Sequence, residues 1–163
     1  MKFSSLNIFK LIVANAMLIG ATVNATSLWS LNATDINGDI VDFQQYSGSV
    51  ALVINVATYW GTTKANYQCM EQLQKDYAEK DVKLFLFPCN QFLFQEPDTN
   101  AKIKAFASGY LNISKGSNVV LFSKSGCNKE CHTTGSDQCV LSSKNCCTAN
   151  NPIYDYLKLF FNQ

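Results

Sequence analysis

Two continuous apolar runs separated by a helical pattern constrain the fold of this chain more than any other feature. Residues 50–57 (VALVINVA) and 82–87 (VKLFLF) are nearly uninterrupted in apolar side chains, which is typical of strands buried on both faces of a parallel sheet. Between them, apolar residues recur at helical spacing and predict a helix over residues 62–78. A strand, a helix and a strand in this order form a right-handed βαβ unit, so we expect an α/β fold.

Shorter patterns surround this central unit. Residues 28–34 and 40–43 are predicted strands joined by Asn37-Gly38. Asn-Gly is typical of a tight hairpin, because both residues tolerate the positive φ of a type I′ turn. The remaining predicted elements are a helix, a strand and a final helix, at residues 98–109, 118–123 and 152–161.

The N-terminal 25 residues have the organisation of a secretory signal. Lys2 and Lys10 flank a short polar start, an apolar stretch covers residues 11–23, and small residues precede position 26. The apolar stretch is shorter than the ~20 residues that span a bilayer, so we favour cleavage over an uncleaved anchor. We therefore predict a signal peptide over residues 1–25 and one secreted domain over residues 26–163, without a membrane attachment after cleavage.

Two glycosylation sequons agree with export. Asn32 begins Asn-Ala-Thr and Asn112 begins Asn-Ile-Ser, and both are candidate acceptors in a secreted protein. The charge balance also narrows the partners. Lysines number 13 against 12 acidic residues and form no basic run, so we expect no nucleic-acid partner.

Two motifs carry a resemblance to a known family. Residues 55–63 read NVATYWGTT and residues 87–97 read FPCNQFLFQEP. They resemble the glutathione peroxidase motifs NVAS-x-U/C-G-x-T and FPCNQF-x-x-QEP, in the right order and each where a strand ends. The resemblance covers most of the mature chain. It implies a thioredoxin-like fold of the glutathione peroxidase type and the reduction of hydrogen peroxide or organic hydroperoxides by a thiol such as glutathione, in the oxidative stress response and without a prosthetic cofactor.

In this chain, Trp60 occupies the position of that family's reacting selenocysteine or cysteine. A thiol or selenol at the start of a helix is held as its anion and attacks a peroxide oxygen. The resemblance implies that Gln91 hydrogen-bonds this chalcogen. Tryptophan cannot take its place, because the indole N–H is only a hydrogen-bond donor.

Three explanations of Trp60 stay open. In the first, catalysis has been lost and the chain is a secreted binding protein. In the second, the codon is UGA, which is read as selenocysteine in this family and as tryptophan in several genetic codes. In the third, a cysteine codon changed to a tryptophan codon by one base. The first two have equal weight, so the assignment as an enzyme is undecided from sequence. The codon at position 60 distinguishes them.

Two other cysteines, Cys89 and Cys69, are weaker candidates for the role of the chalcogen missing at position 60. Cys89 lies within the second motif and is a candidate redox residue, although a buried small side chain at a strand end is the favoured interpretation. Cys69 lies nine residues along the helix from position 60, roughly 13 Å away. It therefore cannot share the site.

Residues 126–148 form a predicted irregular insert rich in cysteine. We favour two disulfides within it over a zinc site that would use cysteines and His132, because export favours oxidation and the spacing matches no common zinc finger. We therefore predict no metal site, and a cysteine-rich metal-binding module is the less favoured alternative. The disulfide candidates, one of which is left over, are Cys127, Cys131, Cys139, Cys146 and Cys147.

The end of the chain departs from the family pattern. The family's later WNF motif, which completes its catalytic group, has no counterpart here. We therefore expect an apparently truncated C-terminus that leaves sheet surface uncovered. An uncovered sheet of this kind favours association, so we expect the protein to be either oligomeric or aggregation-prone.

Overall fold

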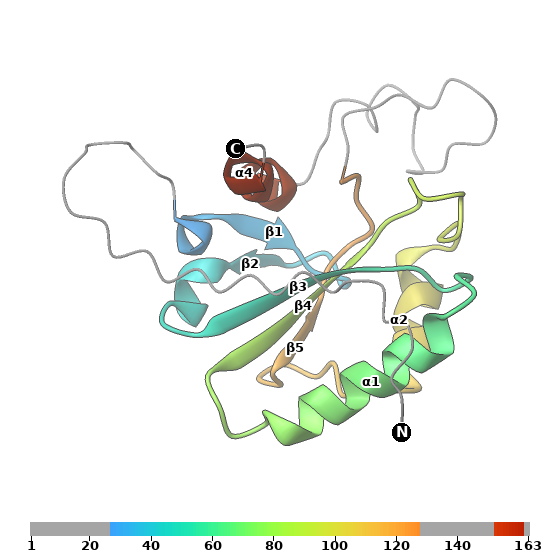
Figure 1. Ribbon diagram of the computed structural model, residues 1–163, viewed down its shortest axis with the longest axis horizontal. Coiled ribbons are helices and arrows are strands. Elements are labelled where there is room, and N and C mark those ends of the chain that lie inside the picture. The colour runs from blue at the N-terminus through green and yellow to red at the C-terminus, as the bar shows by residue number, and fades with distance from the viewer. Residues whose placement is uncertain (1–26, 128–151, 162–163) are drawn as a thin grey trace.

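The computed structural model describes residues 27–127 and 152–161 (Figure 1). Its helices and strands are, in chain order, η1 (Leu28–Ser30), β1 (Asn32–Thr34), β2 (Ile40–Asp42), η2 (Phe43–Tyr46), β3 (Val50–Val56), α1 (Thr63–Asp76), β4 (Val82–Pro88), α2 (Asn100–Ser108), β5 (Val119–Leu121) and α4 (Pro152–Phe161). Among these residues no helix combines the length and the apolar character needed to cross a membrane.

The predicted βαβ unit is confirmed. β3 and β4 pair in parallel over their full length, from Val50 opposite Val82 to Val56 opposite Pro88, and α1 connects them. β5 pairs in parallel with the other side of β4, so the sheet order is β3-β4-β5. β4 is therefore the central strand of the described sheet.

The expectation that both central strands are buried on both faces is correct for β4 and wrong for β3. From Leu84 to Pro88, every residue of β4 is buried, whereas in β3 only Ile54 and Val56 are buried and the first residue, Val50, is 40% exposed. The difference follows from position. Only β4 has a hydrogen-bonded strand on each side, while β3 is an edge of the described sheet. An apolar run in the sequence does not distinguish an edge strand from a central one.

The N-terminal hairpin forms, but two details of its prediction are wrong. The first part of the predicted strand is the 3-10 turn η1, in which the Ser27 hydroxyl accepts from the Trp29 N–H at 3.2 Å. The turn is not type I′, because Gly38 has a positive φ of 97° and Asn37 does not. The Asp35 carboxylate explains this geometry, since it accepts from the backbone N–H groups of Asn37 and Asp39 at 2.8 and 2.9 Å.

Side chains of β4 point alternately into two apolar cores. Leu84 and Leu86 pack on the face covered by α1 and α2, against residues that include Tyr67, Met70 and Ile103. Phe85 and Phe87 point to the opposite face, which carries the β1–β2 hairpin and α4 (Figure 1). The strand period of two thus supplies both cores from one segment.

The second core is aromatic. Phe85 lies at ring-centroid distances of 5.0 Å from Phe43 and 5.4 Å from Phe122, while Phe87 stacks on Phe122 at 4.4 Å. α4, which the sequence predicts over the same residues, closes this core with Ile153 and Tyr154. A segment far along the chain therefore covers the sheet face that β4 presents.

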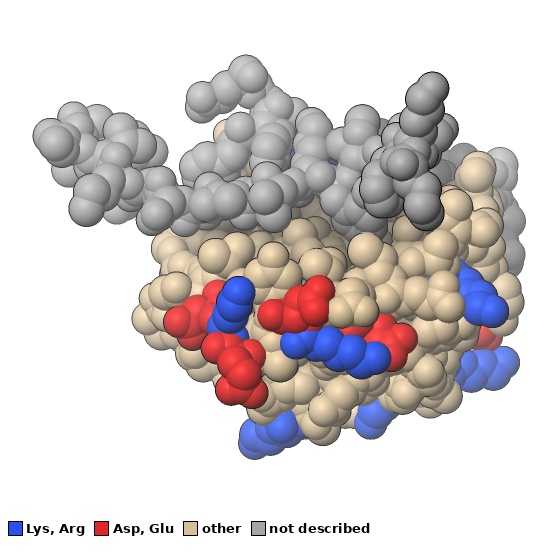
Figure 2. All heavy atoms as spheres, turned by 60° about the horizontal axis from the view of Figure 1, so that its bottom comes forward, with Lys and Arg blue, Asp and Glu red and all other residues tan. Residues whose placement is uncertain are grey.

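Most charged side chains lie on the surface and are mixed in sign, with Glu96 as a buried exception. Figure 2 shows lysines and acidic residues interspersed on one face of the molecule. Two pairs one helical turn apart lie on exposed surface, Lys75 with Glu71 at 2.6 Å and Lys102 with Asp98 at 3.3 Å. Pairs of this kind contribute about 0–1 kcal/mol each, so the fold rests on its two apolar cores.

The aromatic core gives a direct test of the fold. We expect Phe85→Ala to lower the free energy of unfolding by about 3–5 kcal/mol, because the Phe85 ring is fully buried among other rings. Phe92→Ala is the matched control, since the Phe92 side chain is 48% exposed, and it should change stability by about 0.5 kcal/mol or less. Urea unfolding followed by tryptophan fluorescence measures both. Equal losses would contradict the assignment of Phe85 to the core.

Candidate functional site

The two motifs meet at the carboxyl ends of β3 and β4. The Cys89 N–H donates to the carbonyl of Val56 at 3.1 Å, and the Tyr59 N–H donates to the carbonyl of Gln95 at 3.0 Å. The loop after β3 and the loop after β4 therefore lie side by side. Carboxyl ends of parallel strands are the usual place for ligand sites in α/β sheets.

Trp60 lies at the exposed end of the first loop. Its side chain is 51% exposed, and its carbonyl accepts from the N–H of Thr63, the first residue of α1, at 2.9 Å. The Thr63 hydroxyl donates to the carbonyl of Ala57 at 2.6 Å and closes the turn. Position 60 is thus presented to solvent just before a helix N-terminus, where backbone N–H groups favour an anion.

Gln91 lies in the second loop and is buried. Its Oε1 accepts from the Cys127 N–H at 2.7 Å and lies 3.8 Å from the Cys89 sulfur. Gly126 approaches so closely that a Cβ there would lie 3.3 Å from Gln91 Nε2. The segment after β5 therefore positions Gln91. The hydrogen bond from Gln91 to a chalcogen at position 60 stays a prediction.

Glu96 joins the two loops from within. Its side chain is fully buried, and Oε2 accepts from the Thr58 N–H at 2.7 Å and from the Thr58 hydroxyl at 3.0 Å. The Glu96 N–H donates to Asn90 Oδ1 at 2.8 Å. Desolvation raises the pKa of Glu96 above its ordinary value, although the bonds from Thr58 oppose this shift. The buried acid holds the first loop against the second.

The rim of the site is held by polar contacts. The Tyr59 hydroxyl donates to Asp98 at 2.7 Å, and this hydrogen bond lowers the pKa of the Asp98 carboxyl. Lys124 donates to the carbonyls of Glu96 and Asp98 at 3.1 and 2.6 Å. The residues that follow β5 therefore fix the second loop from the other side.

The tip of the second loop is strained and apolar. Leu93 and Phe94 have positive φ values of 54° and 56°, a backbone region that costs a bulky residue roughly 1–2 kcal/mol. Large apolar side chains are exposed here and in the first loop, namely Tyr59, Trp60, Phe92, Leu93 and Phe94. Strain and exposed apolar surface together are typical of a functional loop.

The predicted cysteine and glycosylation sites have different outcomes. Cys89 is buried, as the favoured interpretation has it, and its sulfur lies 2.8 Å from that of Cys127. Asn32 and Asn112 are both exposed. Four disulfide candidates and one alternative zinc ligand lie outside the described residues, namely Cys131, Cys139, Cys146, Cys147 and His132. Within the described ranges, no group of three or more His, Cys, Asp or Glu residues could hold a metal ion.

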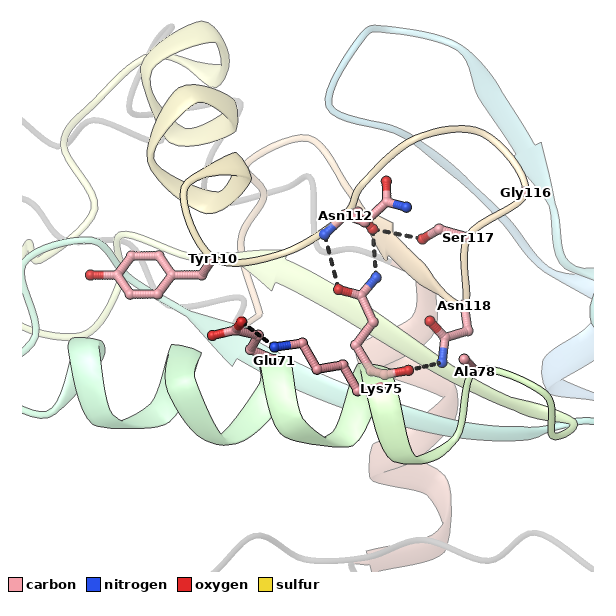
Figure 3. Close-up of a pocket in the computed structure, with 9 residues that line it drawn as sticks. Glu71, Lys75, Ala78, Tyr110, Asn112, Gly116, Ser117 and Asn118 are labelled. Atoms are coloured by element: carbon pink, nitrogen blue, oxygen red, sulfur yellow. Dashed lines mark hydrogen bonds and ion pairs between the residues drawn. The ribbon is translucent and has the colours of Figure 1, made fainter.

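A pocket of about 390 Å³ lies away from these loops (Figure 3). It is lined by Gln74 and Lys75 near the end of α1, whereas Trp60 precedes the start of that helix. Gln74 exchanges hydrogen bonds of 2.7 and 2.9 Å with the backbone of Asn112, and Lys75 pairs with Glu71. Because these groups form hydrogen bonds and an ion pair with one another, the pocket lies where α1 contacts the loop before β5. It is separate from the site.

Sequence reasoning missed the residues that couple distant segments. Asn55 accepts a hydrogen bond from the Tyr154 hydroxyl of α4, and Lys158 donates to the carbonyl of Cys127 at 2.6 Å. Glu96 belongs to a recognised motif, yet nothing in its spacing indicates Thr58 as its partner. Only the arrangement of β3, β4 and α4 in space brings these residues together.

A family model described as glutathione peroxidase matches residues 28–134. Phospholipid hydroperoxide glutathione peroxidase of Macaca fuscata fuscata is 46% identical over 86 residues, 53% of this chain and 44% of that protein. Glutathione peroxidase 7 of Mus musculus is 43% identical over 86 residues, 53% of this chain and 46% of that protein. In both alignments the matched region spans less than half of the relative.

A solved structure resembles the fold. The crystal structure of T. cruzi GPX1 has a TM-score of 0.50 and 21% sequence identity, and the match covers 82% of this chain and 66% of that one. At this level of identity the likeness concerns the fold.

The buried Glu96 gives a pH test of the site. Because the folded protein raises the pKa of this carboxyl above about 4.5, the folded chain holds the proton more tightly than the unfolded chain. The contribution of Glu96 to stability therefore falls as pH rises from below 4.5 through the folded-state pKa. The side chain of Glu96→Gln cannot titrate. The part of the fall in the urea midpoint between about pH 4 and pH 7 that comes from Glu96 should therefore be absent in this variant.

Glu71→Gln on the α1 surface is the matched control, because it also removes one carboxyl group. It should keep the fall in stability shown by the parent chain. If Glu96→Gln has the same pH dependence as the parent chain, Glu96 does not titrate differently in the folded state.

Proposed function

Because the chain belongs to the glutathione peroxidase family, we propose that its function is the reduction of hydrogen peroxide or organic hydroperoxides by a thiol, with position 60 as the reacting position. The predicted thioredoxin-like fold is confirmed by the same comparisons. One observation carries the proposal: position 60 is exposed, lies just before α1 and adjoins the loop of the second motif. A peroxide can reach that position from solvent.

The proposed reaction needs a chalcogen at position 60. Its anion attacks one peroxide oxygen, the O–O bond breaks, and water or an alcohol leaves while the chalcogen becomes a selenenic or sulfenic acid. A first thiol then forms a mixed disulfide or selenylsulfide and releases water. A second thiol releases the oxidised disulfide and restores the anion. The chain contributes the N-terminus of α1, which stabilises the anion, and Gln91 in the adjoining loop.

Selenocysteine is our proposed residue at position 60 in the cell. Trp60 is half exposed and belongs to neither apolar core, so the fold does not depend on an indole there. A UGA codon in the transcript would support this proposal, and a UGG codon would contradict it.

A binding function is the second candidate, and one observation favours it. Five large apolar side chains are exposed on the two loops of the site, and such a surface is typical of a contact with another molecule. With tryptophan at position 60 the loops would bind without reacting.

The protein with Trp60 should show no thiol-dependent peroxidase turnover, because the indole forms no sulfenic-acid equivalent. Trp60→Cys should acquire it. Tyr59→Cys is the matched control, since the neighbouring Tyr59 side chain is 59% exposed on the same loop. We expect Trp60→Cys to be roughly 5- to 10-fold faster than this control, because a helix N-terminus favours a thiolate by about 1 kcal/mol.

Consumption of hydrogen peroxide with dithiothreitol or glutathione measures the turnover. Equal rates for the two cysteine variants would show that position 60 has no special reactivity. Turnover by the Trp60 protein that disappears in Cys89→Ser would make Cys89 the nucleophile.

Export through the secretory pathway is part of the proposal. Its support is the signal-like pattern of residues 1–25 and the exposure of both sequon asparagines, Asn32 and Asn112. Secretion would place the peroxidase reaction in an oxidising compartment, with a small thiol or a thiol protein as its reductant.

Both sequons should carry glycans when the full chain is expressed in a eukaryotic secretory host. Treatment with an N-glycosidase should lower the apparent mass, and Asn32→Gln and Asn112→Gln should each remove part of that difference. Asn37→Gln changes an exposed asparagine outside a sequon and should leave the mass pattern unchanged. A secreted protein whose mass the glycosidase does not alter would contradict the glycosylation proposal.

A further inference from the structure

We propose that Cys89 and Cys127 form a disulfide bond that joins the end of β4 to the segment that follows β5. The two sulfur atoms lie 2.8 Å apart, although the residues are 38 positions apart in the chain. This separation is ~0.8 Å longer than the ~2.05 Å of a disulfide bond. A shift of less than 1 Å therefore brings the sulfurs to bonding distance.

Backbone hydrogen bonds hold both cysteines in this arrangement. The Cys89 N–H donates to the carbonyl of Val56 at 3.1 Å, and the Ser125 N–H donates to the carbonyl of Pro88 at 3.0 Å. The segment that follows β5 thus runs beside the residue that precedes Cys89. Fixed backbones on both sides mean that the cross-link needs no rearrangement of β4 or β5.

Contacts around Cys127 fix it from two further directions. Its N–H donates to Gln91 Oε1 at 2.7 Å, and its carbonyl accepts from Lys158 of α4 at 2.6 Å. Both cysteine side chains belong to the aromatic core that α4 covers, with exposures of 1% for Cys89 and 3% for Cys127. The disulfide would tie β4, the segment after β5 and α4 into one unit.

The bond forms by exchange with a small disulfide such as glutathione disulfide. The thiolate of one cysteine attacks a sulfur of that disulfide, and the S–S bond breaks to release one thiol. The other cysteine loses its proton and attacks the mixed disulfide, releasing the second thiol. Two S–H bonds of the protein are replaced by one S–S bond, and the small disulfide takes up the two electrons and two protons.

Burial determines when this exchange takes place. The hydrogen bond with Cys89 and desolvation raise the pKa of the Cys127 thiol, and the reactive thiolate is therefore scarce in the folded chain. A small disulfide also has little access to sulfurs that are almost fully buried. The cross-link therefore forms while the segment after β5 is still open, and once closed it resists reductants until the protein unfolds.

This pairing also resolves the odd number of cysteines in the insert. With Cys127 bonded to Cys89, four cysteines of the insert remain, an even number, and Cys69 is exposed on α1. The proposal involves no chemistry at position 60. It therefore stands or falls independently of the peroxidase function.

A non-reducing peptide map of the full secreted chain tests the bond directly. After alkylation in denaturant without reductant, trypsin cleavage at lysine places Cys89 alone in peptide 84–102 and Cys127 alone in peptide 125–129. The other insert cysteines fall in peptides 130–144 and 145–158. We expect a species of 84–102 linked to 125–129 that separates into its two peptides on reduction.

Two outcomes of the map would overturn the proposal. One is recovery of peptide 84–102 with Cys89 alkylated. The other is a link from peptide 125–129 to peptide 130–144 or 145–158, which would pair Cys127 within the insert, one of the pairings that the sequence prediction left open. Because the map uses the parent protein, it decides the question even if a cysteine variant fails to fold.

Thermal melting gives the second measurement. Cys89→Ser and Cys127→Ser should each lower the Tm by roughly 10 °C under non-reducing conditions, as expected for the loss of a bond that closes a loop of this length. The double variant should melt at about the same temperature as either single variant. Cys69→Ser is the matched control and should keep the parent Tm; equal melting of all these proteins would contradict the bond.

Discussion

The pairing of β4 between β3 and β5 is the constraint on which the rest of the structure depends. Because β4 has a strand on each side, its successive side chains are buried on opposite faces and supply two cores. Leu84 and Leu86 require α1 and α2 on one side, while Phe85 and Phe87 require the hairpin and α4 on the other. Loss of either cover would expose apolar surface that the strand period places there.

The same strand determines where the site lies. β4 ends at Pro88, and the next residues leave the sheet beside the end of β3. Over these few residues the chain changes from apolar core to buried polar contacts. Glu96 accepts a hydrogen bond from the Thr58 N–H, and Gln91 accepts one from the Cys127 N–H. These contacts position two loops whose outer surfaces are exposed and apolar. The core thus supports the two loops of the site without contributing to their exposed surface.

Sequence patterns predicted the elements well, because each depends on local periodicity. The βαβ unit and α4 were recognised from the spacing of apolar residues alone, and two motifs identified the loops of the site. What the patterns missed has two causes. Whether β3 is an edge and whether Cys127 meets Cys89 depend on neighbours in space, whereas the Asp35 cap is a local contact that the Asn-Gly pair alone does not indicate. No spacing in the sequence encodes a contact between residues 38 positions apart.

Exposure separates the chemistry proposed for position 60 from the cross-link proposed for the cysteine pair. A peroxide must reach its nucleophile, and a thiol must reach the oxidised product, so a reacting atom has to be open to solvent. Trp60 meets that condition, whereas Cys89 and Cys127 are almost fully buried. Burial instead suits a bond that is made once and kept. The same region can therefore support both a reactive position and a permanent cross-link. Gln91 contacts Cys89 and Cys127, so the cross-link would fix the position of Gln91 in the site.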